Sequence, residues 1–333
     1  MSDLASIPAR PWPCSARAPG KCILFGEHAV VRGAPELALA IDLRTQVIAR
    51  PAPRLRLNAD PDAAGHNPYL RAALAVDGAT TPPLDIRSVS RVPRSAGLGS
   101  SAAFVAALCA SLAAARGGIE RADLAQRAFA VERAAQGVGS PGDTSTSVAG
   151  GYVSLNEPGS RGTPLWSVHA GDERWEVRRE QDPGWVWVVA YSGIPRSTAE
   201  AVRAVGDRLE RPDGPALLEE FRRVARRGID AVGRGEREEV GRLLARNQEL
   251  LREVGVSHPR LEALLEAAAP VAAGAKLTGA GRGGSIVVLP LPGREVELLR
   301  RLARAGAAAF AVRPAAGVEL VDAEPLGDPE PRA

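Results

Sequence analysis

The stretch Pro93-Arg94-Ser95-Ala96-Gly97-Leu98-Gly99-Ser100-Ser101-Ala102-Ala103 places glycines and serines directly before an alanine-rich segment. Residues 102–116 contain neither Pro nor Gly, and such a composition propagates a helix. We therefore predict a short loop at the N-terminus of this helix, where backbone N–H groups have no intrahelical partner and the helix dipole is positive. Glycine lets the backbone approach a ligand closely. The stretch is typical of a phosphate-binding loop; a helix with an ordinary serine cap is the alternative.

The length of 333 residues favours two domains, and 45% hydrophobic residues are enough for a substantial core. A net charge of +3 without a basic cluster argues against nucleic-acid binding. Residues 1–18 contain prolines where a signal peptide has its apolar core, and no segment is apolar enough to span a membrane, so we expect a cytoplasmic protein. The three cysteines form no CxxC motif, which indicates neither a disulfide framework nor a zinc site.

Lysine is rare in this chain. Of 42 basic residues only Lys21 and Lys276 are lysines, so arginine is the default cation. Both lysines lie near glycines, in Pro19-Gly20-Lys21 and in Lys276-Leu277-Thr278-Gly279-Ala280-Gly281. An ammonium is compact and its pKa is tunable, whereas a guanidinium is wide and planar. We interpret both positions as requiring lysine.

The order of predicted elements indicates an α+β fold, with strand–helix alternation in the first half and mostly helices in the second. Strands are expected over residues 16–25 (interrupted at Pro19-Gly20), 37–49, 84–89, 152–155 and 185–191. Helices are expected over residues 68–76, 121–136, 197–209, 216–232, 236–254, 259–269 and 296–305. Residues 137–147 are predicted to form a tight turn that contains Asp143, and residues 273–289 a strand, a glycine turn and a strand. The first dozen residues are expected to be loosely held.

These parts together suit phosphoryl transfer: two lysines near glycines, a phosphate loop, and carboxylates at Glu27, Glu132 and Asp143. The reaction needs a triphosphate held in line, its charge neutralised, and an acceptor hydroxyl oriented by a carboxylate. The chain has no GxxxxGK[ST] motif and no protein-kinase HRD or DFG set. A kinase of another class is therefore indicated.

Three segments carry a resemblance to the GHMP small-molecule kinases. They are Pro19–Val31 (PGKCILFGEHAVV), Gly97–Ala103 (GLGSSAA) and Lys276–Ser285 (KLTGAGRGGS), in the order found in that family. The resemblance implies a two-domain fold, with a ribosomal S5-like N-terminal domain (residues 1–180), a ferredoxin-like C-terminal domain (residues 181–333) and an active site in the cleft between them. It also implies ATP and Mg²⁺ as cofactors.

The resemblance implies a role for each residue that matches a functional residue of the family. Asp143 corresponds to the carboxylate that faces the acceptor hydroxyl, and Lys21 to the lysine near the transferred phosphoryl group. Glu132, 11 residues before Asp143, corresponds to the Mg²⁺-binding glutamate, and Ser101 to the serine that shares the metal. The residues expected to bind ATP are Ser95, Ala96, Gly97, Leu98, Gly99, Ser100, Ser101, Gly279 and Gly281.

On the acceptor side, Gly-Glu-His-Ala-Val-Val resembles most the family members that phosphorylate mevalonate, which implies mevalonate as the small-molecule substrate and 5-phosphomevalonate as the product. Glu27 and His28 are then expected to line the mevalonate pocket. Arg196 is expected to hold the substrate carboxylate bidentately, and Thr198 to support Asp143 or the pocket. The resemblance leaves a homodimer open.

Several departures from the usual motifs of this family leave other functions open. Arg282 interrupts a glycine run, Ser285 stands where cysteine is common, Gln136 replaces a frequent histidine, and Ser140-Pro141-Gly142-Asp143 differs from the usual Ser-Gly-x-Asp. At a positive φ, an arginine costs about 1–2 kcal/mol. The alternatives are another kinase of this family (acting on homoserine, phosphomevalonate or the 3-hydroxyl of mevalonate) and a non-catalytic nucleotide-binding protein.

Overall fold

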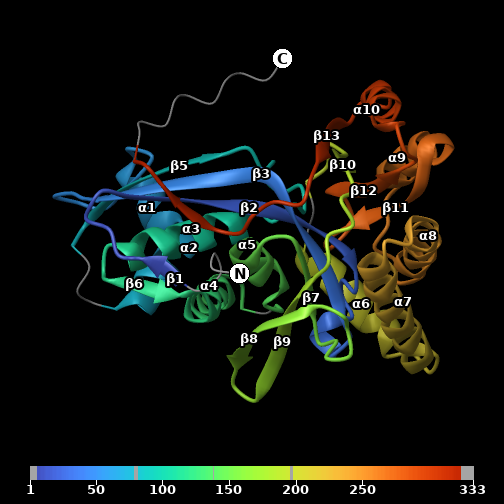
Figure 1. The fold of residues 1–333 in the computed structure, drawn as a ribbon, viewed down its shortest axis with the longest axis horizontal. Helices are drawn as coiled ribbons and strands as arrows, with labels where there is room; N and C mark the ends of the chain where they lie inside the picture. Colours follow the sequence, from blue (N-terminus) through green and yellow to red (C-terminus); the bar gives the residue numbers. More distant parts are fainter. Residues whose placement is uncertain (1–5, 79–81, 138, 196–197, 324–333) are drawn as a thin grey trace.

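The computed structural model describes residues 6–78, 82–137, 139–195 and 198–323. Figure 1 shows two halves, one built on a large sheet covered by helices and the other on a small sheet surrounded by helices. The two halves have the mixed α+β architecture expected from the order of elements. The exact division of the chain into residues 1–180 and 181–333 stays a prediction.

The large sheet has eight strands, with the order β14-β2-β3-β7-β9-β8 and with β5 and β4 continuing from β3. Its strands are β2 (Cys14–Phe25), β3 (Glu36–Pro51), β4 (Arg56–Leu57), β5 (Leu84–Ser90), β7 (Tyr152–Leu155), β8 (Thr163–Ala170), β9 (Glu173–Glu180) and β14 (Glu319–Val321). Both β2 and β3 are buried along most of their length, and their apolar runs Cys22–Phe25 and Leu37–Ile41 are buried at every position. They reach from the helices of the first half to those of the second (Figure 1).

Strand β2 is one continuous strand, and the predicted interruption appears as a β-bulge between Pro19 and Gly20. Proline donates no ladder hydrogen bond, so it is confined to such irregular positions or to edges. A bulge re-aims the side chains beside it, and the residue directly after this one is Lys21.

Helices of the first half pack on β2 and β3 and on one another. They are α1 (Pro61–His66), α2 (Pro68–Asp77), α3 (Ser100–Ala114), α4 (Arg121–Gln136) and α5 (Gly142–Ala149). Helix α3 is buried nearly all round, as its alanine-rich sequence allows, because small side chains permit close contact with both the sheet and α4.

The second half has a four-stranded antiparallel sheet with the order β11-β12-β10-β13. Its strands are β10 (Trp187–Tyr191), β11 (Ala272–Thr278), β12 (Ser285–Pro290) and β13 (Ala308–Val312). Its helices are α6 (Thr198–Leu209), α7 (Gly214–Arg234), α8 (Arg237–Glu253), α9 (Pro259–Ala268) and α10 (Glu295–Arg304), with short 3-10 helices at η1 (Val30–Arg32) and η2 (Ala269–Val271). No helix in the described part of the chain is long and apolar enough to cross a membrane.

Two predictions of local structure are wrong. The predicted turn over residues 137–147 contains helix α5 from Gly142 onward. Its glycine, serines and threonines are poor helix formers, but all its residues except Asp143 are buried, so packing overrides propensity. At the N-terminus, β1 (Ser6–Pro8) pairs with β6 (Gly118–Glu120) and buries Ile7, so residues 6–8 are held in place and not loose.

Candidate active site

The phosphate loop lies where it was expected, at the N-terminus of α3. The helix begins at Ser100, and its N-cap is Gly99 in the left-handed region (φ 74°) with no side-chain cap hydrogen bond. The alternative of an ordinary serine cap therefore does not apply. The first amide groups of α3 are available to an anion, and the helix dipole reinforces them.

The loop packs directly on Lys21. The Lys21 backbone N–H donates to the carbonyl of Leu98 over 2.9 Å. A Cβ at Gly99 would come within 2.7 Å of Lys21 Cγ, and a Cβ at Gly20 within 2.7 Å of the Leu98 oxygen. Both glycines are thus required for this close approach, which brings the first and second motifs together.

The third motif is tied to both of the others. The Ser285 hydroxyl donates to the Ala96 carbonyl over 2.8 Å, which anchors the phosphate loop to β12. The Thr278 hydroxyl accepts a hydrogen bond of 2.8 Å from the Ile23 backbone N–H, which joins β11 to β2. The serine found where cysteine is common is therefore a structural link between the motifs.

Arg282, inside the third motif, has a φ of 56°, the strained conformation considered above. Its guanidinium Nε donates to the Gly255 carbonyl, over 3.3 Å in an exposed position. We expect Arg282→Gly to raise the free energy of unfolding by about 0.5–1 kcal/mol, since the strain exceeds the added entropy of an unfolded glycine. Urea unfolding measures this gain. Arg282→Ala is the control, because it removes the guanidinium but keeps the strain; equal stability of both variants would contradict the explanation.

Lys21 and Asp143 form an ion pair within the site. Lys21 Nζ lies 2.8 Å from Asp143 Oδ1, and the two side chains are 1% and 25% exposed. The bulge in β2 directs the lysine inward, and the first turn of α5 presents the aspartate. A buried ammonium next to a partly open carboxylate can stabilise developing negative charge on an oxygen that approaches the carboxylate.

Ser101 and Glu132 form a second polar pair close to the loop. The Ser101 hydroxyl donates to Glu132 Oε1 over 3.4 Å, and Gln136 Nε2 donates to the same oxygen over 3.0 Å. The glutamate is 8% exposed. A hydroxyl and a carboxylate are the oxygen ligands that Mg²⁺ prefers, and Mg²⁺ keeps most of its other ligands as water and phosphate. The pair fits such a site, and no group of three or more His, Cys, Asp or Glu side chains is arranged for a metal among the described residues.

Lys276 holds Glu27. The ammonium and the carboxylate form a fully buried ion pair, and Asn247 Nδ2 donates to the other Glu27 oxygen over 3.1 Å. Burial lowers the pKa of Lys276, and the charge of Glu27 opposes this shift. Lys276 therefore anchors the Gly-Glu-His segment, and Glu27 presents to the site an already neutralised charge.

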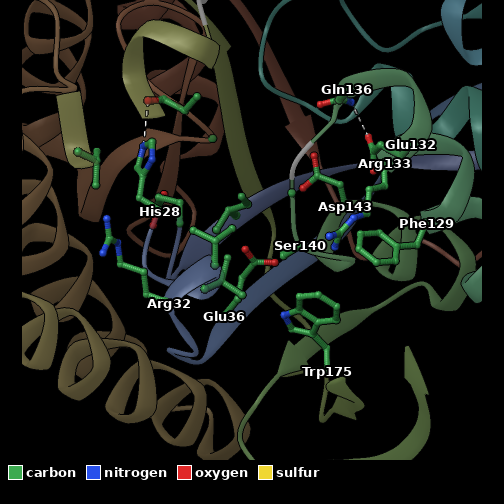
Figure 2. Close-up of a pocket in the computed structure, with 18 of the residues that line it drawn as sticks. His28, Arg32, Glu36, Phe129, Glu132, Arg133, Gln136, Ser140, Asp143 and Trp175 are labelled. Carbon is green, nitrogen blue, oxygen red and sulfur yellow. Dashed lines mark hydrogen bonds between the residues drawn. The ribbon is translucent and has the colours of Figure 1, made fainter. Parts of the chain in front are cut away.

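His28 stands at the turn after Glu27 with a φ of 64°. Its Nε2 lies 3.0 Å from the Ala280 carbonyl, so the ring bridges the first and third motifs. Arg32 lies at the same end of the site (Figure 2).

One pocket of about 480 Å³ connects these groups. The predicted site residues that line it are Lys21, Glu27, His28, Glu132, Asp143 and Gly279. Residues 95–101 and Gly281 do not line it. The phosphate loop contacts Lys21 but does not line this pocket, and the nucleotide roles of these residues stay predictions.

The side chains of two residues predicted to belong to the site, Arg196 and Thr198, lie outside the described part of the structure. Arg196 lies outside the described residues. Thr198 is the first residue of α6, but its side chain is outside them as well.

Several residues that line the pocket were not predicted from the sequence. Figure 2 shows Glu36, Phe129, Arg133 and Trp175 around the same space as Asp143. The aromatic residues give no signal in the sequence, since they are typical of any core. Glu36 does give one, because it is a single acid at the start of the apolar segment Leu37–Ile41.

The structure brings together a buried lysine paired with a partly exposed aspartate, a Ser–Glu pair and a glycine-rich helix N-terminus without a side-chain cap, an arrangement suited to phosphoryl transfer. Comparisons with known proteins agree. Residues 67–151 match the GHMP kinases N terminal domain, and residues 229–308 match the GHMP kinases C terminal family. The chain belongs to the GHMP kinase family and is a kinase that uses ATP and a small-molecule substrate.

Its relatives point to one branch of that family. The chain is similar to the mevalonate kinase of Methanothermobacter thermautotrophicus, with 35% identity over 82% of this chain and 89% of the relative. It is 33% identical to that of Archaeoglobus fulgidus, over 81% and 90%. The fold matches Methanococcus jannaschii mevalonate kinase (TM-score 0.71, 23% identity, 92% and 99% covered) and L. major mevalonate kinase in complex with R-mevalonate (0.74, 22%, 93% and 100%).

Proposed function

We propose that this chain transfers the γ-phosphoryl group of ATP to the primary hydroxyl of mevalonate, giving 5-phosphomevalonate and ADP. The observation that carries the proposal is the Lys21–Asp143 pair, which lines the pocket and whose lysine also contacts the phosphate loop. The similarity to mevalonate kinases over more than four fifths of the chain supports the choice of acceptor.

In the proposed reaction the acceptor hydroxyl sits beside Asp143, which orients it and takes its proton as the oxygen attacks phosphorus. Lys21 Nζ, held by Asp143 and by the packing of the loop, stabilises the negative charge that develops on the attacking oxygen and the transferred group. The amide groups of residues 95–101 hold the remaining phosphates at the N-terminus of α3.

Mg²⁺ would be held by the Ser101 hydroxyl and the Glu132 carboxylate, and it would neutralise phosphate charge. We expect Glu132→Gln to raise the Mg²⁺ concentration for half-maximal activity at least about tenfold, because the amide oxygen carries no net charge. The measurement is ADP release against Mg²⁺ concentration at fixed ATP. Glu266→Gln, exposed on α9, is the control. An unchanged Mg²⁺ dependence would remove Glu132 from the metal site.

At the other end of the pocket, His28 and Arg32 are the candidates for contact with the substrate carboxylate. Arg196 and Thr198, whose side chains lie outside the described residues, keep the roles predicted from the sequence. The apolar wall formed by Val30, Phe129 and other side chains suits a branched hydrocarbon skeleton such as that of mevalonate.

The decisive experiment is a panel of acceptors with the purified chain, ATP and Mg²⁺, followed by ADP release. Mevalonate, homoserine, galactose and phosphomevalonate are compared by kcat/KM. We expect mevalonate to exceed the others by at least about tenfold. A preference of this size for another acceptor would transfer the proposal to another member of the family, and nucleotide binding without turnover on any acceptor would favour a non-catalytic protein.

A further inference from the structure

Glu36 is a buried acid that the mechanism above does not use. It is the first residue of β3, its side chain is 1% exposed, and it lines the pocket beside Asp143. No described residue provides a hydrogen-bond partner for its Oε1 atom, which is fully buried. Buried polar atoms nearly always have a partner, so an unpaired one on a residue that lines a pocket requires an explanation.

The place of Glu36 depends on Gly142, the first residue of α5. A Cβ at this position would lie 1.8 Å from Glu36 Oε1, so any larger residue would force the carboxyl group out of its observed position. Gly142 directly precedes Asp143, and Figure 2 shows Glu36 and Asp143 reaching into the same space from β3 and α5. The altered turn Ser140-Pro141-Gly142-Asp143 thus makes space for a second carboxyl group next to the proposed base.

The surroundings of Glu36 favour its neutral form. Burial raises its pKa to about 8, and the charge of Asp143 contributes in the same direction. The other charged groups that act on it are Lys21 on β2 and Lys276 on β11, which lower its pKa, and Glu27, which raises it. Across β3, its partner on β7 is the apolar Leu155. At neutral pH the carboxyl group is mostly protonated and can donate a hydrogen bond.

We propose that Glu36 is a specificity-determining residue, which donates a hydrogen bond from its neutral carboxyl group to a second oxygen of the acceptor substrate, next to the hydroxyl that Asp143 faces. The inference rests on the proposed function, and it specifies the class of substrate that the pocket accepts. The substrate class that fits is a hydroxy acid, in which an oxygen beyond the reacting hydroxyl accepts this hydrogen bond. A substrate without such an oxygen leaves the donor unpaired and binds less tightly.

The proposal implies that the KM for the acceptor depends on pH. The protonated form of Glu36 binds substrate; as the pH rises through about 8, the donor is lost and the new charge repels an anionic substrate. The KM for the acceptor should therefore rise about tenfold between about pH 7 and pH 9. The kcat should change less, because Asp143, and not Glu36, is the proposed base for the reacting hydroxyl.

The experiment measures KM and kcat for the acceptor at saturating ATP across this pH range, in the wild type, Glu36→Gln, Glu36→Ala and the control Glu266→Gln. Glutamine keeps a donor that does not titrate, so its KM should stay within about twofold over the range. Alanine should have a KM raised about tenfold at neutral pH, and its KM should not rise further with pH. The control should follow the wild type.

Three outcomes would overturn the inference: a wild-type KM that does not vary with pH, a Glu36→Gln variant whose KM rises with pH as expected for the wild type, or a Glu36→Ala variant with the wild-type KM. A merely structural role would lower the stability of both variants to unfolding without separating their pH profiles. If another acceptor proves to be the substrate, the proposed function fails, and the same profiles are measured with that acceptor. If mevalonate is phosphorylated and its KM in the wild type does not vary with pH, only the role of Glu36 fails.

Discussion

Asp143→Asn is expected to lower kcat by about a thousandfold, because the amide cannot take the proton of the acceptor hydroxyl and leaves Lys21 without its anionic partner. The dissociation constant for ATP should change little, since the loop proposed to hold the phosphates is anchored by a hydrogen bond from the Lys21 backbone. Steady-state ADP release measures the first quantity, and titration with a non-hydrolysable ATP analogue the second.

The control for this variant is Asp62→Asn, which makes the same chemical change at an exposed position in the first turn of α1. It should have the kcat of the wild type. An Asp143→Asn enzyme within about fivefold of the wild type would exclude Asp143 as the base and leave it the role of holding Lys21.

The second large effect concerns stability. Lys276→Met is expected to lower the free energy of unfolding by about 3–5 kcal/mol, because it leaves the Glu27 carboxylate buried without its counter-charge. Methionine fills most of the space of the lysine stem, so the loss comes mainly from the charge. Urea unfolding at neutral pH measures it.

The double variant Glu27→Gln/Lys276→Met isolates the electrostatic origin of this loss. Without the carboxylate, no charge is left unpaired, and we expect about half or more of the lost stability to return. A double variant as unstable as Lys276→Met alone would show that the lysine acts through packing and through its contact with the Ile23 carbonyl.

The structure gives a physical reason for a lysine at each of these two positions, and this reason cannot be read from the sequence alone. Each is fully buried and paired with a carboxylate: Lys21 with Asp143, and Lys276 with Glu27. Rarity and neighbouring glycines indicated the positions, but the partners lie more than a hundred residues away and are set by the packing of β2 against α5 and β11.

Helices with clear apolar periodicity were predictable, and α4 (Arg121–Gln136) has the bounds expected from the sequence. Helix α5 was not, since its serines and threonines favour turns until burial forces them into a helix. Glu36 gives a local signal, as a single acid before an apolar segment, but its place in the site was not predictable. Its environment depends on a glycine more than a hundred residues later, and no local pattern records that the two positions share one volume.

Strand β14 (Glu319–Val321) borders β2 on the side opposite β3, so the strand that carries Lys21 gains its second neighbour from a segment almost 300 residues later. During synthesis on the ribosome the large sheet cannot be completed until residues 319–321 have emerged, long after the phosphate loop and α5 have formed. Pairing over such a sequence distance closes late and slowly. A nascent chain halted before this segment should therefore leave the edge of β2 open to other strands, and a chaperone that covers open edges would act in this interval.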